Sequence, residues 1–168
     1  IPVVIGVLVS VVLLQVGLEN FRHSFFTVPY LFVLSELLKL CRFFLHEAGH
    51  VYWRIFGETF GVMGGTLNEV LLPLLLAVYC FGKMYLRFGG LLLFFTGLNL
   101  HYVAWYISDV AGRSEAELPM HGIHDWKFIF DRFGLGQNVS GYGNFADTSG
   151  MVLLYSGVCI LMIAFVGG

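Results

Sequence analysis

The sequence predicts an all-α fold, a polytopic transmembrane helical bundle of about five spans. Of the 168 residues, 58% are hydrophobic and only 12% are charged, about half the charged share of an ordinary soluble domain. Five apolar segments approach the roughly 20 residues that a helix needs to cross a bilayer. We therefore expect one integral-membrane, multi-pass domain over residues 1–168, embedded in the lipid bilayer. The net charge of −2 does not suggest a nucleic-acid partner.

The expected spans cover residues 1–18, 25–55, 67–82, 88–112 and 150–168. Between the second and third spans, the glycine-rich stretch 57–66 predicts a short hairpin or re-entrant loop, because glycine permits sharp turns. Pro73 lies inside the third span and should disturb the carbonyl of Glu69 and kink the helix. The polar loop 113–149 contains a short amphipathic segment that ends at Gly134, a pattern typical of an interfacial helix.

The second span is unusual because polar side chains gather along one side of it. On a helical wheel this side holds Ser35, Glu36, Lys39, Arg42, His46, Glu47, His50 and Arg54. A charged side chain in the middle of a bilayer costs about 2.5–3.5 kcal/mol on insertion scales. The stripe must therefore face protein, water or a metal ion rather than lipid.

Part of this stripe has the pattern H-E-x-x-H, formed by His46, Glu47 and His50. Residues four apart on a helix lie one turn apart on the same face, so both imidazoles can reach one ion. Glu47 lies beside them, where it can take a proton from a metal-bound water and return it to a leaving group. Two imidazoles, an oxygen ligand and an open position suit Zn²⁺. The alternative is a polar helix face with two ordinary hydrogen-bonding histidines.

The third ligand has more than one candidate. Asp109 lies with Asn99 on a polar seam of the fourth span, and an intramembrane carboxylate is a functional candidate by default. It could instead pair with the arginine four residues later. The run M-H-G-I-H-D-W offers His121, His124 and Asp125 as alternative ligands. That run could also simply start an interfacial helix, with Asp125 as its N-cap.

The motif H-E-A-G-H at 46–50, the glycine-rich stretch after it and a later polar span with an aspartate together resemble the site-2 protease family of intramembrane zinc metalloproteases. The resemblance covers about residues 40–112. It implies that His46, His50 and an aspartate, here Asp109, bind Zn²⁺ and that Glu47 is the general base. In the family the aspartate usually follows an Asn-Pro stretch in an L-D-G context, whereas this chain reads Y-I-S-D-V-A-G.

The resemblance also implies how a substrate would bind. A glycine hairpin at 57–66 would pair with an extended peptide strand, so we expect substrate contacts at Gly64 and Gly65, with Asn99 nearby. Three functions follow from these patterns. The first is a zinc protease that cleaves a transmembrane peptide. The second is a membrane zinc hydrolase that acts on a lipid amide or ester. The third is a non-catalytic subunit or assembly factor of a larger membrane complex.

Overall fold

The computed structural model of the chain describes residues 2–22, 29–112 and 125–167. The helices in order are α1 (Pro2–Arg22), α2 (Pro29–Trp53), the 3₁₀ turn η1 (Arg54–Phe56), α3 (Glu58–Gly82), α4 (Leu86–Gly112), α5 (Asp125–Phe133), the 3₁₀ turn η3 (Gly136–Asn138) and α6 (Val139–Val166). No strand occurs within these described ranges, so the all-α prediction is confirmed there.

Three helices are long and apolar enough to cross a membrane in the part of the chain that the structure describes. They lie at Glu58–Gly82, Leu86–Val110 and Gly136–Val166. Three of the five predicted spans, the third, fourth and fifth, are therefore supported. The first predicted span holds a shorter apolar stretch, Val3–Gln15, and the second carries the polar stripe, which lowers its hydropathy.

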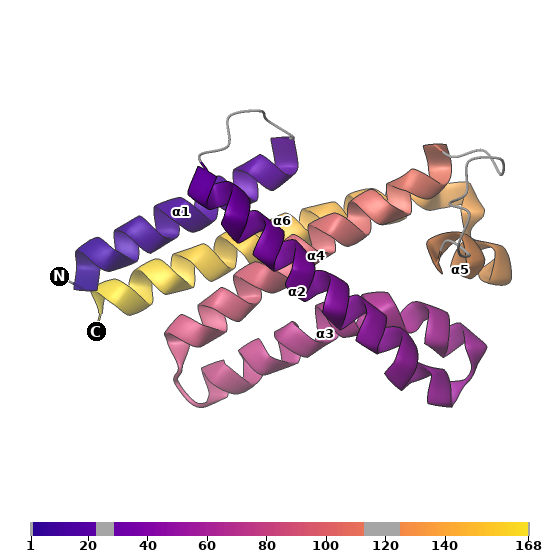
Figure 1. Ribbon diagram of the computed structural model, residues 1–168, viewed down its shortest axis with the longest axis horizontal. Coiled ribbons are helices and arrows are strands. Elements are labelled where there is room, and N and C mark those ends of the chain that lie inside the picture. Colours follow the sequence, from indigo (N-terminus) through magenta and orange to yellow (C-terminus); the bar gives the residue numbers. More distant parts are fainter. Residues whose placement is uncertain (1, 23–28, 113–124, 168) are drawn as a thin grey trace.

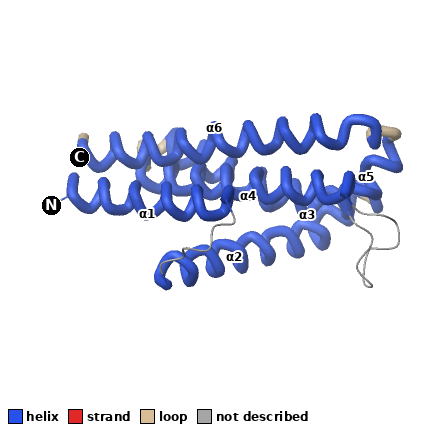
Figure 2. Tube along the Cα trace, turned by 90° about the horizontal axis from the view of Figure 1, so that it is seen from above, coloured by secondary structure: helices blue, strands red, loops and turns tan. Residues whose placement is uncertain are grey.

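The long helices α4 and α6 run side by side and form the centre of the bundle (Figure 1). Phe94 and Leu98 of α4 pack there against Leu154 and Leu161 of α6, and all four side chains are at most 2% exposed. Helix α1 packs on α6, while α2 packs on α3 and forms a separate layer when the molecule is seen from above (Figure 2). His46 and His50 of the polar face of α2 are thus placed against α3, whereas Glu47 on the same face is exposed.

The predicted hairpin at 57–66 is wrong, because α3 begins at Glu58 and continues without interruption to Gly82. Gly57 alone makes the turn, with φ of +111°, a region that favours glycine. The later glycines instead allow α2 and α3 to approach closely. A Cβ atom on Gly49 would lie 2.1 Å from the carbonyl oxygen of Gly64.

The described part of the predicted polar loop, residues 125–149, is also more helical than the sequence predicts. The amphipathic helix is confirmed as α5, and Gly134 follows it with φ of +68°. Helix α6 begins at Val139, so the fifth span starts earlier than residue 150. Its first turns are rich in glycine and polar residues, which hides a helix from a search for apolar runs.

Helix α3 continues through Pro73, which is buried. Proline has no N–H, so the carbonyl of Glu69 four residues earlier loses its usual helix partner. The side-chain amide of Asn99 in α4 donates a hydrogen bond to this carbonyl at 2.6 Å. The proline therefore creates a fixed link between α3 and α4 at Glu69.

Candidate metal centre

His46 and His50 of α2 and Asp125 of α5 form a group of possible metal ligands. The Oδ2 atom of Asp125 lies 3.1 Å from Nε2 of His46 and 3.4 Å from Nε2 of His50. The three ligand atoms all lie within 4.8 Å of one another, so one ion between them could contact all three. The exposed fractions of the side chains are 16%, 28% and 14% in the same order. The group is therefore partly shielded from solvent.

The other ring nitrogens of the two histidines contact hydrogen-bond acceptors on α3. Nδ1 of His50 lies 2.8 Å from the carbonyl oxygen of Gly61, and Nδ1 of His46 lies 3.3 Å from Oε1 of Glu69. A carbonyl oxygen only accepts, so Nδ1 of His50 carries the proton. In a neutral ring this leaves the lone pair on Nε2, which faces Asp125. Metal-binding histidines are usually held in this way, by an acceptor behind the ring.

Glu69 is a carboxylate in the interior of the bundle, with 1% of its surface exposed. Its Oε1 atom contacts His46, while Oε2 is buried without a hydrogen-bond partner among the described residues. An ionised carboxylate is costly to bury unless positive charge lies close to it. A cation bound at His46 would supply that charge. In the sequence, Glu69 stands out as a carboxylate inside an apolar span. Its place behind a possible metal ligand is visible only from its contact with His46.

Small residues on both helices place α3 close to the histidines. A Cβ atom on Gly65 would lie 2.6 Å from Nε2 of His46, and one on Gly64 would lie 2.5 Å from the carbonyl oxygen of Gly49. Asn68 adds a hydrogen bond from its amide to the carbonyl oxygen of Leu45 at 2.6 Å. The two glycines expected to contact substrate therefore lie, buried, in the interface that positions His46.

The other predicted site residues lie outside the group. Glu47 is exposed on α2, and Asp109, the first choice for the third ligand, is half-buried in α4. Asp125, one of the alternatives, is the carboxylate that faces both histidines. His121 and His124 lie outside the described residues. Asn99 is 1% exposed and its amide bonds to α3 rather than facing an open surface.

A cavity of about 590 Å³ adjoins the metal group. Its lining includes two of the three possible ligands and is completed by polar and small residues; the lining residues are His50, Arg54, Glu58, Gly61, Val62 and Asp125. Its size is within the range of about 300–1,000 Å³ that is typical of small-molecule sites. A water molecule and part of a substrate could therefore reach an ion held by the group.

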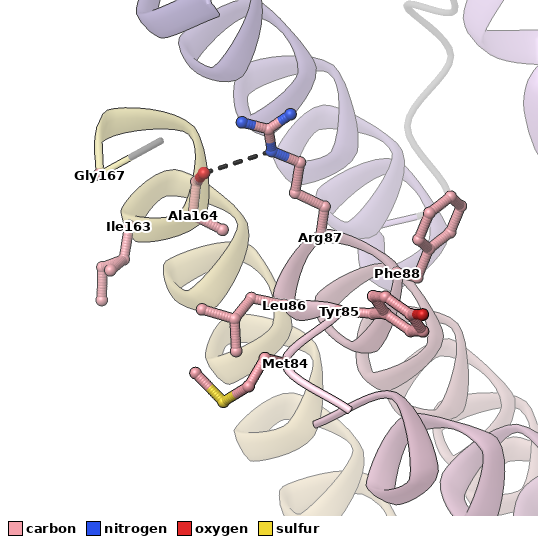
Figure 3. Close-up of a pocket in the computed structure, with 8 residues that line it drawn as sticks. All are labelled: Met84, Tyr85, Leu86, Arg87, Phe88, Ile163, Ala164 and Gly167. Carbon is pink, nitrogen blue, oxygen red and sulfur yellow. Dashed lines mark hydrogen bonds between the residues drawn. The ribbon is translucent and has the colours of Figure 1, made fainter. Parts of the chain in front are cut away.

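A second cavity, of about 390 Å³, lies at the other end of α3, between the α3–α4 turn and the end of α6 (Figure 3). Arg87 is the charged side chain in its lining, and its Nε donates a hydrogen bond to the carbonyl oxygen of Ala164 at 3.3 Å (Figure 3). The guanidinium also lies over the ring of Phe165, 4.5 Å from its centre. These contacts join α4 to α6, and none of the described lining residues is a histidine or an acidic residue.

Replacing Glu69 by glutamine is expected to weaken metal binding by this group about 10–100-fold, the usual cost of losing a carboxylate behind a histidine ligand, with Zn²⁺ as the probe ion. The amide keeps the shape but removes the negative charge beside His46. Zinc affinity is measured by competition with a chromophoric chelator in detergent. The control is Glu36→Gln, since Glu36 is exposed on α2 and pairs only with Lys39 at 2.7 Å among the described residues. Equal affinities in the two variants would contradict a role for Glu69.

Comparisons of this chain with protein-family models, with curated proteins and with solved structures found no match.

Proposed function

We propose that this chain is a membrane zinc hydrolase in which His46, His50 and Asp125 hold one Zn²⁺. The observation that carries the proposal is the orientation of the two imidazoles. Both Nε2 atoms face the same oxygen of Asp125, and both Nδ1 atoms contact acceptors on α3. Nitrogen and oxygen ligands of this kind suit zinc, and three protein ligands leave a position open for water or substrate.

The adjoining cavity supports a catalytic rather than a closed structural site. A bound Zn²⁺ lowers the pKa of water and polarises a carbonyl group. The protein must then hold the substrate and accept a proton. Arg54 lines the cavity and could stabilise negative charge that develops on the substrate.

Two glutamates are candidates for the proton acceptor. Glu47 directly follows His46, and its exposed side chain has no hydrogen bond or ion pair among the described residues, so it is free to turn toward the ion. Glu58 lines the cavity itself, at the first turn of α3. We assign the role of proton acceptor to Glu47, as the resemblance to site-2 proteases implies. Glu58 serves as the control position in the test.

Replacing Glu47 by glutamine is expected to keep zinc bound and to lower turnover about 10²–10⁴-fold, the usual contribution of a positioned general base. The assay uses zinc-loaded protein in detergent and follows release of 4-methylumbelliferone from its butyrate to palmitate esters. Glu58→Gln should keep most of the activity. If Glu58→Gln loses turnover and Glu47→Gln does not, Glu58 on α3 is the proton acceptor instead.

A metal-binding subunit without catalysis is the second candidate function. The observation that favours it is that Glu47 is absent from the residues that line the cavity. This reading predicts one zinc per chain and no ester or amide hydrolysis by the wild-type protein. A peptide substrate that adds a strand at 57–66 has no support from the fold, because that segment is helical.

A further inference from the structure

A third cavity, of about 370 Å³, lies between α3, α4, α5 and α6. Its wall is formed mainly by aliphatic and aromatic side chains, with Thr66 and Ser149 beside them, and no charged side chain of the described residues lines it. Representative members are Val70, Val103, Phe130 and Ala146. Leu71 and Phe145 line it as well but are 37% and 74% exposed. The cavity therefore opens at the outer surface between α3 and α6, two of the helices able to span a membrane.

The cavity is close to the metal group along the chain, but it shares no lining residue with the cavity that adjoins that group. Thr66 lines it and directly follows Gly65, where an added Cβ would lie 2.6 Å from Nε2 of His46. Trp126 lines it and directly follows Asp125, the carboxylate of the group. The apolar cavity is therefore a site separate from the metal group.

Two polar atoms of the lining residues lack partners. Oγ1 of Thr66 and Nε1 of Trp126 are both buried without a hydrogen bond among the described residues. Buried polar groups normally have a partner, and both of these atoms can donate. Neither atom lies on the cavity surface, which is almost wholly apolar, so the cavity suits a hydrocarbon chain rather than a polar group.

The size of the cavity distinguishes a chain from a single side chain. An apolar cavity of about 150 Å³ holds one benzene ring, so a phenylalanine or leucine side chain of a peptide would leave more than half of this space empty. A flexible hydrocarbon chain can fill it. Its mouth between spanning helices is where a lipid chain would enter from the bilayer.

We propose that this cavity binds the acyl chain of a membrane lipid or single-chain amphiphile, which would enter from the bilayer between α3 and α6.

The test for the acyl site measures binding of a fatty acid by fluorescence quenching and does not depend on hydrolysis. Trp53→Phe and Trp105→Phe together leave Trp126 as the only tryptophan, and palmitic acid brominated in mid-chain is added in detergent micelles. Quenching of Trp126 should saturate and should be reversed by unbrominated palmitic acid. The comparison protein keeps only Trp105, which is 56% exposed and does not line the cavity, so its quenching should rise with the brominated fraction of the micelle without saturating.

Ala146→Phe places a ring in the cavity and should raise the half-saturating concentration about tenfold or more, since excluding about two methylene groups loses that much affinity. The matched control, Val152→Phe, adds the same ring on α6 at a side chain that is 58% exposed, and should change nothing. Quenching that is identical for Trp126 and Trp105, or unaffected by Ala146→Phe, would overturn the proposal.

The same titration is repeated with Asp125→Ala to separate this site from the proposed function. Saturable quenching should persist without the metal ligand, because the chain binds in the cavity. If quenching saturates but wild-type protein binds no zinc, the acyl site stands and the hydrolase fails. If zinc binds and quenching does not saturate, the proposed hydrolase stands and the acyl site fails.

Discussion

Replacing Asp125 by alanine is expected to reduce bound zinc from about one ion per chain to about 0.1 or less under chelator competition, because it removes the only carboxylate that faces both histidines in the described structure. His46 and His50 alone hold zinc too weakly to compete. Metal content is measured by elemental analysis of protein purified in detergent, with circular dichroism as the check on folding.

The control for this variant is Asp131→Ala on the same helix. Asp131 is exposed and contacts Lys127 at 3.0 Å, so its loss removes one negative charge from α5 without touching the metal group. Zinc content should stay near that of the wild type. Full zinc occupancy in Asp125→Ala would exclude this carboxylate as a ligand and return Asp109 and the histidines at 121 and 124 to consideration.

Replacing Gly49 by alanine is expected to destabilise the protein and to weaken zinc binding together. The added Cβ would lie 2.1 Å from the carbonyl oxygen and 2.6 Å from the carbonyl carbon of Gly64. Both are backbone atoms, so α2 and α3 must move apart. Overpacking of this kind costs about 1–3 kcal/mol. The shift also moves His46 and His50 away from Glu69 and Gly61, which orient them.

The measurements are the thermal midpoint in detergent and the zinc affinity. A chain of this length loses about 2–4 °C per kcal/mol, so a fall of several degrees is expected. Gly82→Ala is the matched control, because a Cβ at the end of α3 meets no atom within 4 Å. An unchanged midpoint and zinc affinity in Gly49→Ala would show that the two helices are not packed as described.

Local features of the chain were predicted well because they depend on residues near one another in sequence. The apolar runs predict helices, and the spacing of His46 and His50 places both on one face whatever surrounds them. The amphipathic helix before Gly134 follows from its own periodicity, and the structure has it as α5. These predictions needed no knowledge of the partner helices.

The glycine-rich stretch 57–66 shows where local reasoning fails. Glycines favour a tight turn, but they also permit close contact between two helices. A glycine-rich sequence such as that around Gly64 and Gly65 is therefore compatible both with a tight turn and with a closely packed helix. In the structure these glycines serve the close contact with Gly49 on the facing helix, and that pairing is a tertiary contact.

The sequence by itself determined an all-helical, membrane-suited chain and a pair of histidines positioned for one metal ion. The tertiary structure decided which carboxylate joins them. Asp109 and Asp125 are both plausible from composition, but only the position of α5 brings Asp125 to the histidines. Likewise Glu69 lies behind His46 because the close approach of α2 and α3 at Gly49 and Gly64 brings the two residues together. A metal group is assembled from distant parts of the chain, so its membership depends on helix packing rather than on the spacing of residues along one segment.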